Sequence, residues 1–280
     1  MSVKKNTTKQ SSFFNISFLI DKFMSVKAKK HLGQHFLTDE NIAKKIVDSL
    51  TNEGYKKVLE VGPGMGVLTK YLLEKNQETF VAEIDKESIE YLKQHYEKLE
   101  EAHFVGDFLK INIAEIFQDQ VAVIGNFPYN ISSQILFKII DFYGNVPEMV
   151  GMFQKEVAER TAAVPRTKAY GILSVLVQAL YDVEYLFTVH ENVFNPPPKV
   201  KSGVIKLTRN PKEGLVGNEV LFKQIVKAGF GQRRKKMSNS LKVLDIPEGL
   251  QNHLFLEKRA EELSIADFIS FTQEWKNAAK

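Results

Sequence analysis

The chain has 280 residues, which is enough for a main domain with a smaller one attached, and 44% of them are hydrophobic. This composition excludes a disordered or collagen-like chain, and the lack of cysteine excludes disulfides, cysteine zinc sites and a thiol nucleophile. The net charge of +4 is unevenly distributed, because residues 1–31 hold seven lysines and one acid, and residues 199–242 hold twelve Lys or Arg and two acids. Basic segments on an otherwise acidic chain are typical of proteins that bind nucleic acid, although each segment alone could be solvated surface.

Residues 1–31 have the composition of a basic, disordered extension. The apolar run from Phe13 to Ile20 is interrupted by polar residues and is far shorter than the ~20 residues that span a bilayer. No signal-peptide cleavage site follows it. Residues 24–27 repeat the residue types of residues 1–4, so we expect translation to start at Met24 rather than at Met1. These features, with the lack of cysteine, predict a cytoplasmic protein without a membrane segment.

Strands and helices alternate from residue 38 to residue 208. We expect a helix that is capped by Thr38 or Asp39, because the apolar residues from Ile42 to Leu50 fall on one face. The other predicted elements are, in chain order, a strand over 58–61, a glycine turn over 62–66, a helix over 68–73, a strand over 80–84, a helix over 86–98, strands over 103–105 and 121–125, a helix over 131–142, and strands over 149–153, 183–188 and 202–208. This order predicts an α/β fold with a doubly wound, mostly parallel, Rossmann-like sheet.

Helical periodicity replaces the strand patterns after Thr208 and continues to Trp275. We therefore divide the chain into the extension over 1–31, a sheet domain over 32–208 and a small all-helical domain over 209–280.

A glycine turn and a later acid point to a nucleoside site. The turn Gly62-Pro63-Gly64-Met65-Gly66 follows a strand, and glycines there allow a ligand to approach the backbone closely. The dinucleotide fingerprint is excluded, because it would need glycine at Val67. Glu83 ends the next strand, where a carboxylate can accept hydrogen bonds from ribose hydroxyls. A simple turn and a helix cap remain alternatives for these two features.

Two later strand ends carry further polar groups. Asp107 is placed to accept a hydrogen bond from an adenine amino group, or to cap the next turn. The sequence Asn126-Phe127-Pro128-Tyr129 follows the strand over 121–125, at the edge of the sheet where ligands bind. Asn126 and a backbone carbonyl can accept both N–H groups of an adenine amine, Pro128 constrains the turn, and Tyr129 can stack on the base. The alternative is a turn with a buried aromatic residue.

Taken together, the motifs resemble those of the ribosomal RNA adenine dimethyltransferases. They are Gly33-Gln34-His35-Phe36-Leu37, Glu60-Val61-Gly62-Pro63-Gly64, Glu83-Ile84-Asp85, Gly106-Asp107, Asn126-Phe127-Pro128-Tyr129-Asn130-Ile131-Ser132, and Phe194-Asn195-Pro196-Pro197-Pro198-Lys199-Val200. The resemblance covers the chain from about Lys29 to the helical tail. It implies a class I methyltransferase sheet that uses S-adenosylmethionine and no metal.

The resemblance also implies a role for each site residue. The cofactor-binding set is His35, Leu37, Gly62, Glu83, Asp107 and Asn126, and the catalytic set is Asn126, Pro128, Tyr129 and the stacking residue Phe194. The basic sequence Arg233-Arg234-Lys235-Lys236 is similar to the family's RNA-binding element. Two positions depart from the commonest pattern, which has Asn in place of His35 and Leu in place of Phe127.

The implied reaction is N6 dimethylation of two adjacent adenosines in a hairpin loop near the 3′ end of small-subunit rRNA. The expected partner is the immature small ribosomal subunit, and the protein is expected to be a monomer. The alternatives are a large-subunit rRNA methyltransferase of the macrolide-resistance type, and a non-catalytic assembly or transcription factor on the same fold.

Overall fold

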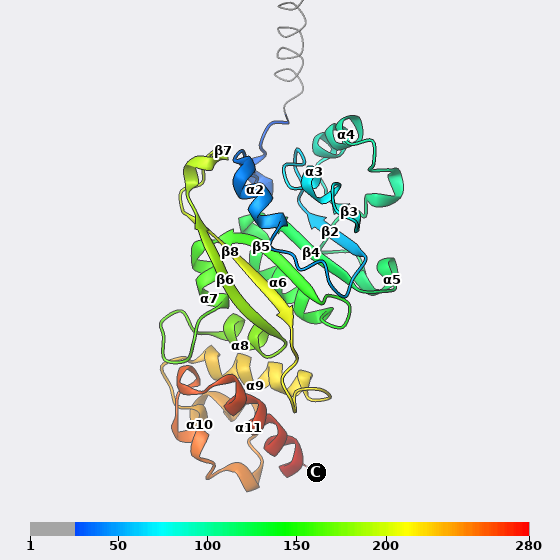
Figure 1. Cartoon of the computed structure of the whole chain (residues 1–280). Helices are drawn as coiled ribbons and strands as arrows, with labels where there is room; N and C mark the ends of the chain where they lie inside the picture. Colours follow the sequence, from blue (N-terminus) through cyan, green and yellow to red (C-terminus); the bar gives the residue numbers. More distant parts are fainter. Residues whose placement is uncertain (1–25, 280) are drawn as a thin grey trace, which may run out of the picture.

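The computed structural model describes residues 26–279, so most of the predicted extension, with Met24, lies outside the described residues. Figure 1 shows a sheet flanked by helices, with the C-terminal helices packed below one end of it. The strands are β1 Phe36–Leu37, β2 Lys57–Val61, β3 Glu78–Ala82, β4 Val121–Asn126, β5 Glu148–Gln154, β6 Tyr181–Val189, β7 Phe194–Asn195 and β8 Ser202–Arg209. The α-helices are α2 Glu40–Val47, α3 Thr69–Leu72, α4 Lys86–His95, α5 Ile113–Phe117, α6 Ser132–Asp141, α7 Lys155–Thr161, α8 Ile172–Gln178, α9 Glu219–Gly231, α10 Met237–Ser240 and α11 Ile265–Ala278.

The main sheet has the strand order β3-β2-β4-β5-β8-β6. β3, β2, β4 and β5 are parallel, and β8 and β6 are antiparallel to their neighbours, which confirms the predicted doubly wound sheet with two closing strands. The predicted strand over 103–105 was wrong. Only Phe104 forms a parallel bridge, to Val81, because a 3₁₀ turn over Glu101–His103 precedes it.

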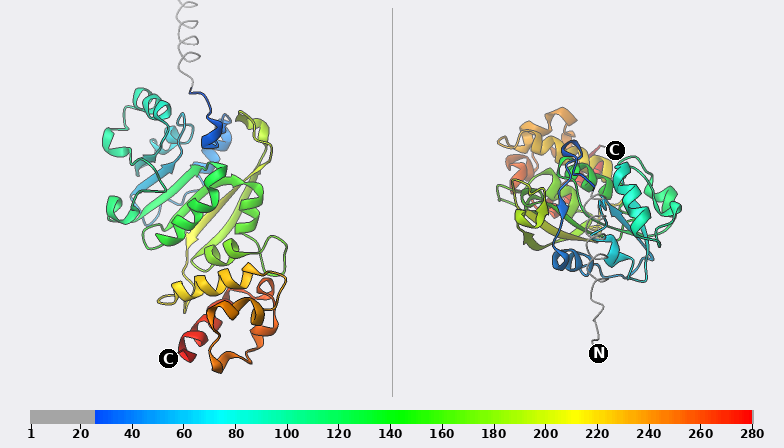
Figure 2. Two further views of the ribbon diagram at one scale, coloured as in Figure 1. Left: turned by 180° about the vertical axis from the view of Figure 1, so that it is seen from behind. Right: turned by 90° about the horizontal axis from the view of Figure 1, so that it is seen from above.

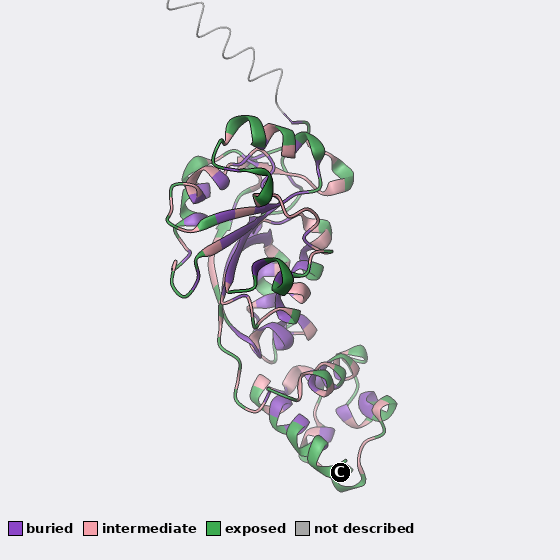
Figure 3. Ribbon diagram, turned by 90° about the vertical axis from the view of Figure 1, so that its right-hand side faces the viewer, coloured by how far each residue is buried: buried purple, intermediate pink, exposed green. Residues whose placement is uncertain are grey.

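Alternate strand residues face two apolar layers, as the two-residue period of a strand requires. Leu59, Val123 and Met149 belong to the larger cluster, which also contains residues of α6 and α8. Residues of the opposite face, such as Val58 and Ile124, belong to a smaller cluster that includes residues of α2 and α3. The view from behind shows α6 and α7 against the sheet, and the burial colouring shows that the central strands are buried (Figures 2 and 3).

Several helix predictions were incomplete. Asp39 caps α2 by accepting from the backbone N–H groups of Asn41 and Ile42, as expected, but α3 is a single turn and α4 ends at His95. α5, α7 and α8 were not predicted. From Ile172 to Val177, α8 is apolar except for Ser174, because it packs within the core on most sides.

The predicted all-helical tail is present as α9, α10, α11 and intervening 3₁₀ turns. The larger apolar cluster continues from α8 into α9 and α11 through residues such as Leu176, Phe222 and Phe268. The Tyr170 hydroxyl donates to the Leu263 carbonyl at 3.0 Å, across the same junction. The tail is therefore packed against the sheet domain over a shared core, and the boundary at residue 208 stays a prediction.

In the part of the chain that the structure describes, no helix is long and apolar enough to cross a membrane. Within the same residues, no group of three or more His, Asp or Glu side chains is arranged to hold a metal ion.

Candidate active site

A pocket lies at the carboxyl edge of β2, β3 and β4, where side chains of successive parallel strands converge. Segment 32–36 closes one side of it, and residues 126–131 after β4 form another. The remaining lining comes from the glycine turn, from the end of β3 and from Asp107. Open α/β sheets bind ligands at this edge. The pocket is lined by Leu32, Gly33, Gln34, His35, Phe36, Val61, Gly62, Gly64, Ala82, Glu83, Ile84, Asp107, Phe108, Asn126, Phe127, Pro128, Tyr129, Asn130 and Ile131.

The glycine turn has the backbone that its sequence predicts. Gly62 and Gly64 have φ values of 69° and 57°, a region that residues with a Cβ rarely adopt. A Cβ on Gly64 would come within 2.7 Å of the Phe36 ring, so glycine also lets segment 32–36 pack closely on the turn. Gly62 and Gly64 both line the pocket, so the turn presents backbone rather than side chains to a ligand there.

Glu83 lies just beyond β3, at the pocket, and is 8% exposed. One carboxylate oxygen accepts from the N–H groups of Ile84 and Asp85, at 2.8 and 2.9 Å. The other accepts from Gly64 N–H only at 3.4 Å, which is a long bond. Burial raises the pKa of Glu83, and these N–H groups oppose that rise. The weakly bonded oxygen is suited to accept hydrogen bonds from ligand hydroxyls.

Asp107 also lines the pocket, but one of its oxygens accepts from Leu109 N–H at 3.0 Å. The other oxygen lies 3.3 Å from the Lys110 amine. Asp107 therefore caps the following turn and also borders the pocket, so its geometry is compatible with both roles that the sequence suggested, a turn cap and an adenine contact.

Asn126 ends β4, and its amide is oriented by segment 32–36. Its side-chain N–H donates to the His35 carbonyl at 2.8 Å. The side-chain oxygen therefore points away from that carbonyl and can accept another hydrogen bond. Among residues 26–279, no hydrogen bond is assigned to this oxygen. Pro128 O accepts from Ile131 N–H at 3.2 Å, so the Phe127 carbonyl is the less engaged of the two backbone candidates.

Tyr129 and Phe194 differ in their access to the pocket. Tyr129 lines it, and its hydroxyl is 2.6 Å from the Ser202 hydroxyl. Phe194 is 4% exposed and packs in the smaller apolar cluster, away from the pocket lining. β1 pairs with β7 so that Leu37 lies opposite Phe194, and Leu37 is also buried. Leu37 borders a neighbouring hollow rather than the main pocket, which Phe36 lines instead.

Two acids of the quoted motifs, Glu60 and Asp85, were given no role from the sequence. Glu60 is fully buried in β2 and borders the neighbouring hollow. Burial raises the pKa of Glu60 to about 8, although a 2.6 Å hydrogen bond from the Thr69 hydroxyl opposes this rise. Asp85 pairs with the Lys29 amine and accepts from Gln34, and although burial opposes its ionisation, these bonds keep its pKa below the usual value. The sequence did show Glu60 as an acid within the apolar run of β2. It gave no sign of the pairing between Lys29 and Asp85, because these residues are 56 positions apart.

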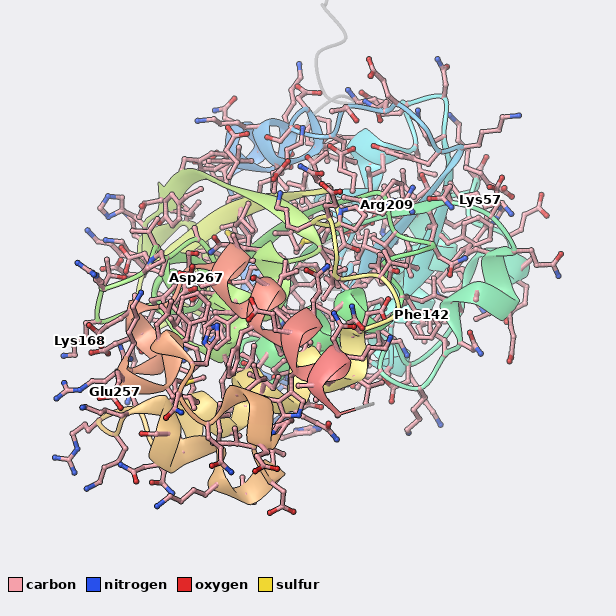
Figure 4. The ribbon with its side chains drawn as sticks, turned by 90° about the horizontal axis from the view of Figure 1, so that it is seen from below. Lys57, Phe142, Lys168, Arg209, Glu257 and Asp267 are labelled. Atoms are coloured by element: carbon pink, nitrogen blue, oxygen red, sulfur yellow. The ribbon has the colours of Figure 1, made fainter. Side chains whose placement is uncertain are left out.

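The basic sequence 233–236 lies in the turn between α9 and α10. Arg233 is engaged within the protein, because it donates to Glu261 at 2.7 Å and to the carbonyls of Lys168 and Thr167. Lys236 pairs with Glu257 at 2.6 Å. Arg234 and Lys235 are exposed and border a hollow with Arg166 and Arg259. In the view from below, Lys168 and Glu257 lie on the same side of the molecule (Figure 4).

The fold and the site together define a class of protein. The chain has a Rossmann-like sheet with a glycine turn after β2, the buried Glu83 after β3, and an Asn-x-Pro-Tyr turn at the end of β4. This is the arrangement of a class I methyltransferase that uses a nucleoside cofactor.

Comparison with known proteins agrees with this class. The family model described as ribosomal RNA adenine dimethylase matches residues 25–277. A protein of Flavobacterium johnsoniae named ribosomal RNA small subunit methyltransferase A is 58% identical over 250 residues, which are 89% of this chain and 96% of that protein. A protein of the same name from Cytophaga hutchinsonii is 57% identical over 249 residues, 88% of this chain and 96% of that one.

Two solved structures are also similar to the chain. A dimethyladenosine transferase from Plasmodium falciparum has a TM-score of 0.74 and 28% identity, and the match covers 88% of this chain and 98% of that one. The 23S rRNA methyltransferase ErmE has a TM-score of 0.60 at 24% identity, covering 84% and 98%, and so shares the fold.

The chain belongs to the ribosomal RNA adenine dimethylase family. It is an rRNA adenine dimethyltransferase, and its methyl donor is S-adenosylmethionine. The pocket fits this cofactor, since a buried carboxylate with one weakly bonded oxygen lies beside two glycines that line the same pocket without side chains.

Proposed function

We propose that the protein transfers two methyl groups to N6 of each of two adjacent adenosines in a hairpin loop near the 3′ end of small-subunit rRNA. The curated relatives at 50–58% identity, which are named for the small subunit, support this substrate over large-subunit rRNA. The chain would act on the immature small subunit in the cytoplasm as a monomer, without a metal. Loop adenosines suit the reaction, because unstacked bases can leave the helix at low cost.

The observation that carries the proposal is the orientation of Asn126. The exocyclic amine of adenine is a poor nucleophile, because its lone pair is delocalised into the ring. With its N–H group committed to the His35 carbonyl, the Asn126 side chain presents oxygen to one adenine N–H. The Phe127 carbonyl would accept the second N–H group of the same adenine amine. Two acceptors favour the pyramidal amine, whose lone pair can attack.

The remaining residues bind and orient. S-adenosylmethionine supplies an electrophilic methyl group on sulfur. Glu83 would hold the ribose hydroxyls through its weakly bonded oxygen, Gly62 would let the backbone approach the cofactor, and Asp107 would meet its adenine. Pro128 constrains the turn that carries Tyr129, and the Tyr129 ring would stack on the target base. The proton leaves the methylated nitrogen to solvent, so no general base is required.

The exposed basic side chains of the tail would contact phosphates. Arg234 and Lys235 make no ion pair among the described residues, whereas Arg233 and Lys236 do. We therefore assign direct RNA contact to Arg234 and Lys235, and a supporting role to Arg233.

The test is methyl transfer from labelled S-adenosylmethionine to purified small and large ribosomal subunits that lack the modification. We expect label only in small-subunit RNA, recovered as N6,N6-dimethyladenosine after digestion. Label in large-subunit RNA would favour the macrolide-resistance type of activity. Lack of label in either subunit would favour a non-catalytic assembly factor.

A further inference from the structure

The turn that begins at Asp107 carries two residues of the pocket lining, Asp107 and Phe108. The turn lies before α5 and outside any helix or strand, so its backbone groups need other partners. The Asp107 carboxylate accepts from the Leu109 N–H at 3.0 Å. The Asp107 carbonyl accepts from the N–H groups of Lys110 and Ile111, at 2.9 and 3.1 Å. The N–H groups of the turn are thus bonded to the residue that borders the pocket.

Lys138, on α6, bonds carbonyl groups of the same turn. Its amine donates to the Leu109 carbonyl at 3.0 Å and also to the Ile111 carbonyl. The amine lies 5.7 Å from the centroid of the Phe108 ring and 5.4 Å from that of the Phe142 ring, within the range of a cation–π interaction. One side chain therefore joins α6 to the turn at several points.

The position of Lys138 is itself fixed by the core. Its neighbours on α6, such as Leu136 and Ile139, are fully buried in the larger apolar cluster. Lys138 is partly buried, which lowers its pKa, and the carboxylates of Asp107 and Asp141 oppose this. The two backbone carbonyls also stabilise the ammonium group by accepting its hydrogen bonds. The turn at Asp107 is therefore held by a group that is anchored in the sheet domain.

We propose that Lys138 is a positioning residue for the cofactor, because it holds this turn so that the Asp107 carboxylate faces the adenine amino group. The inference rests on the adenine contact proposed for Asp107. The path is short, since Leu109 bonds Lys138 through its carbonyl and Asp107 through its N–H. Lys138 lies outside the pocket lining and acts through Asp107 rather than on the cofactor itself. Without its amine, two carbonyls of the turn lose their donor, which favours rearrangement of the turn.

Two ligands separate this role from a general effect on the fold. S-adenosylhomocysteine, which methyl transfer leaves as a product, carries the adenine amino group. S-inosylhomocysteine carries a carbonyl oxygen at that position. A correctly placed Asp107 carboxylate accepts a hydrogen bond from the amino group and repels the oxygen. The ratio of the two Kd values, measured by calorimetry, therefore reports on the placement of Asp107.

The variants have a matched control. Lys138→Met keeps the length of the side chain and removes its donors, whereas Lys138→Arg keeps charged N–H donors. Lys57→Met is the control, because Lys57 is also a partly buried lysine that donates to a backbone carbonyl, that of Phe117, at 3.1 Å. Lys57 begins β2, at the edge of the sheet opposite the pocket, and lies outside the pocket lining.

We expect the parent protein to bind S-adenosylhomocysteine about tenfold or more tightly than S-inosylhomocysteine, since a hydrogen bond to a charged group contributes about that factor or more. In Lys138→Met, affinity for S-adenosylhomocysteine should fall by roughly three- to tenfold, and affinity for S-inosylhomocysteine by less than about twofold. Lys138→Arg should retain most of the ratio, and Lys57→Met should match the parent protein.

Three results would overturn the assignment. They are an equal loss for both ligands in Lys138→Met, no change for either ligand, and an equal fall of the ratio in Lys57→Met. Thermal unfolding identifies a folding defect in Lys138→Met, and Lys138→Gln, which keeps a shorter and uncharged donor, then carries the test with the same expected direction. If the parent protein does not distinguish the two ligands, the adenine contact of Asp107 is wrong and the role of Lys138 fails with it. If the parent distinguishes them and Lys138→Met does so equally well, the failure is specific to Lys138.

Discussion

Glu83 offers a direct test of how the cofactor is held. Its carboxylate bonds the N–H groups of Ile84 and Asp85 through one oxygen, and only the other oxygen, with its 3.4 Å bond from Gly64, is suited to ribose. Glu83→Gln keeps one carbonyl oxygen for the backbone and removes the charge. Glu83→Ala removes both acceptors, so it should lower folding stability as well as cofactor affinity.

The expected loss follows from the kind of bond. A hydrogen bond to a charged group contributes about 1.5 to 3 kcal/mol, which corresponds to a roughly 10- to 150-fold weaker Kd. We expect Glu83→Gln to show this weakening in calorimetry with S-adenosylmethionine while its thermal unfolding stays near that of the parent. A Kd within twofold of the parent value would refute the ribose-binding role of Glu83.

Two further predictions concern the basic turn and the buried acid. The double variant Arg234→Ala, Lys235→Ala should bind RNA more weakly. The slope of its log binding constant against log salt concentration should be shallower by roughly 0.7 to 0.9 for each phosphate that it no longer neutralises, and an unchanged slope would mean that these two side chains are only solvated surface. Arg233→Ala should mainly lower the melting temperature. The folded protein favours the neutral form of the Glu60 carboxyl group. The stability that this preference adds is present below the ordinary pKa of 4.5 and is lost as the pH rises toward about 8. This difference in pKa limits the contribution of Glu60 to the free energy of unfolding to about 5 kcal/mol at most. Glu60→Gln should therefore flatten the fall in melting temperature between pH 5 and pH 8, and equal pH profiles for variant and parent would argue against a neutral Glu60.

The parts of the site that sequence predicted are those at strand ends. Glu83 and Asn126 follow apolar runs that form β3 and β4, and the carboxyl ends of parallel strands share one edge of a sheet. Their convergence on one pocket therefore follows from local patterns and the right-handed alternation of strands and helices. The glycine turn was predictable for the same reason.

The remaining features depend on interactions between distant residues. Arg233 pairs with Glu261, 28 residues later in the chain, so its four-residue basic run could not show that it is engaged internally. Phe194 is buried because β7 pairs with β1, where its partner Leu37 lies 157 residues earlier in the chain. The strand expected over 103–105 depended on only three residues, and a 3₁₀ turn with one bridge replaced it.

The central claim is that Asn126 acts on the amine during methyl transfer, and a single-turnover rate with saturating RNA and cofactor tests it most directly. Hydrogen bonds from the amine to Asn126 strengthen as the nitrogen becomes pyramidal and positive, so they act on the transition state. We expect Asn126→Ala to lower this rate by on the order of a hundredfold or more, with RNA affinity nearly unchanged because basic surfaces supply most of it. A rate close to that of the parent protein would contradict the account.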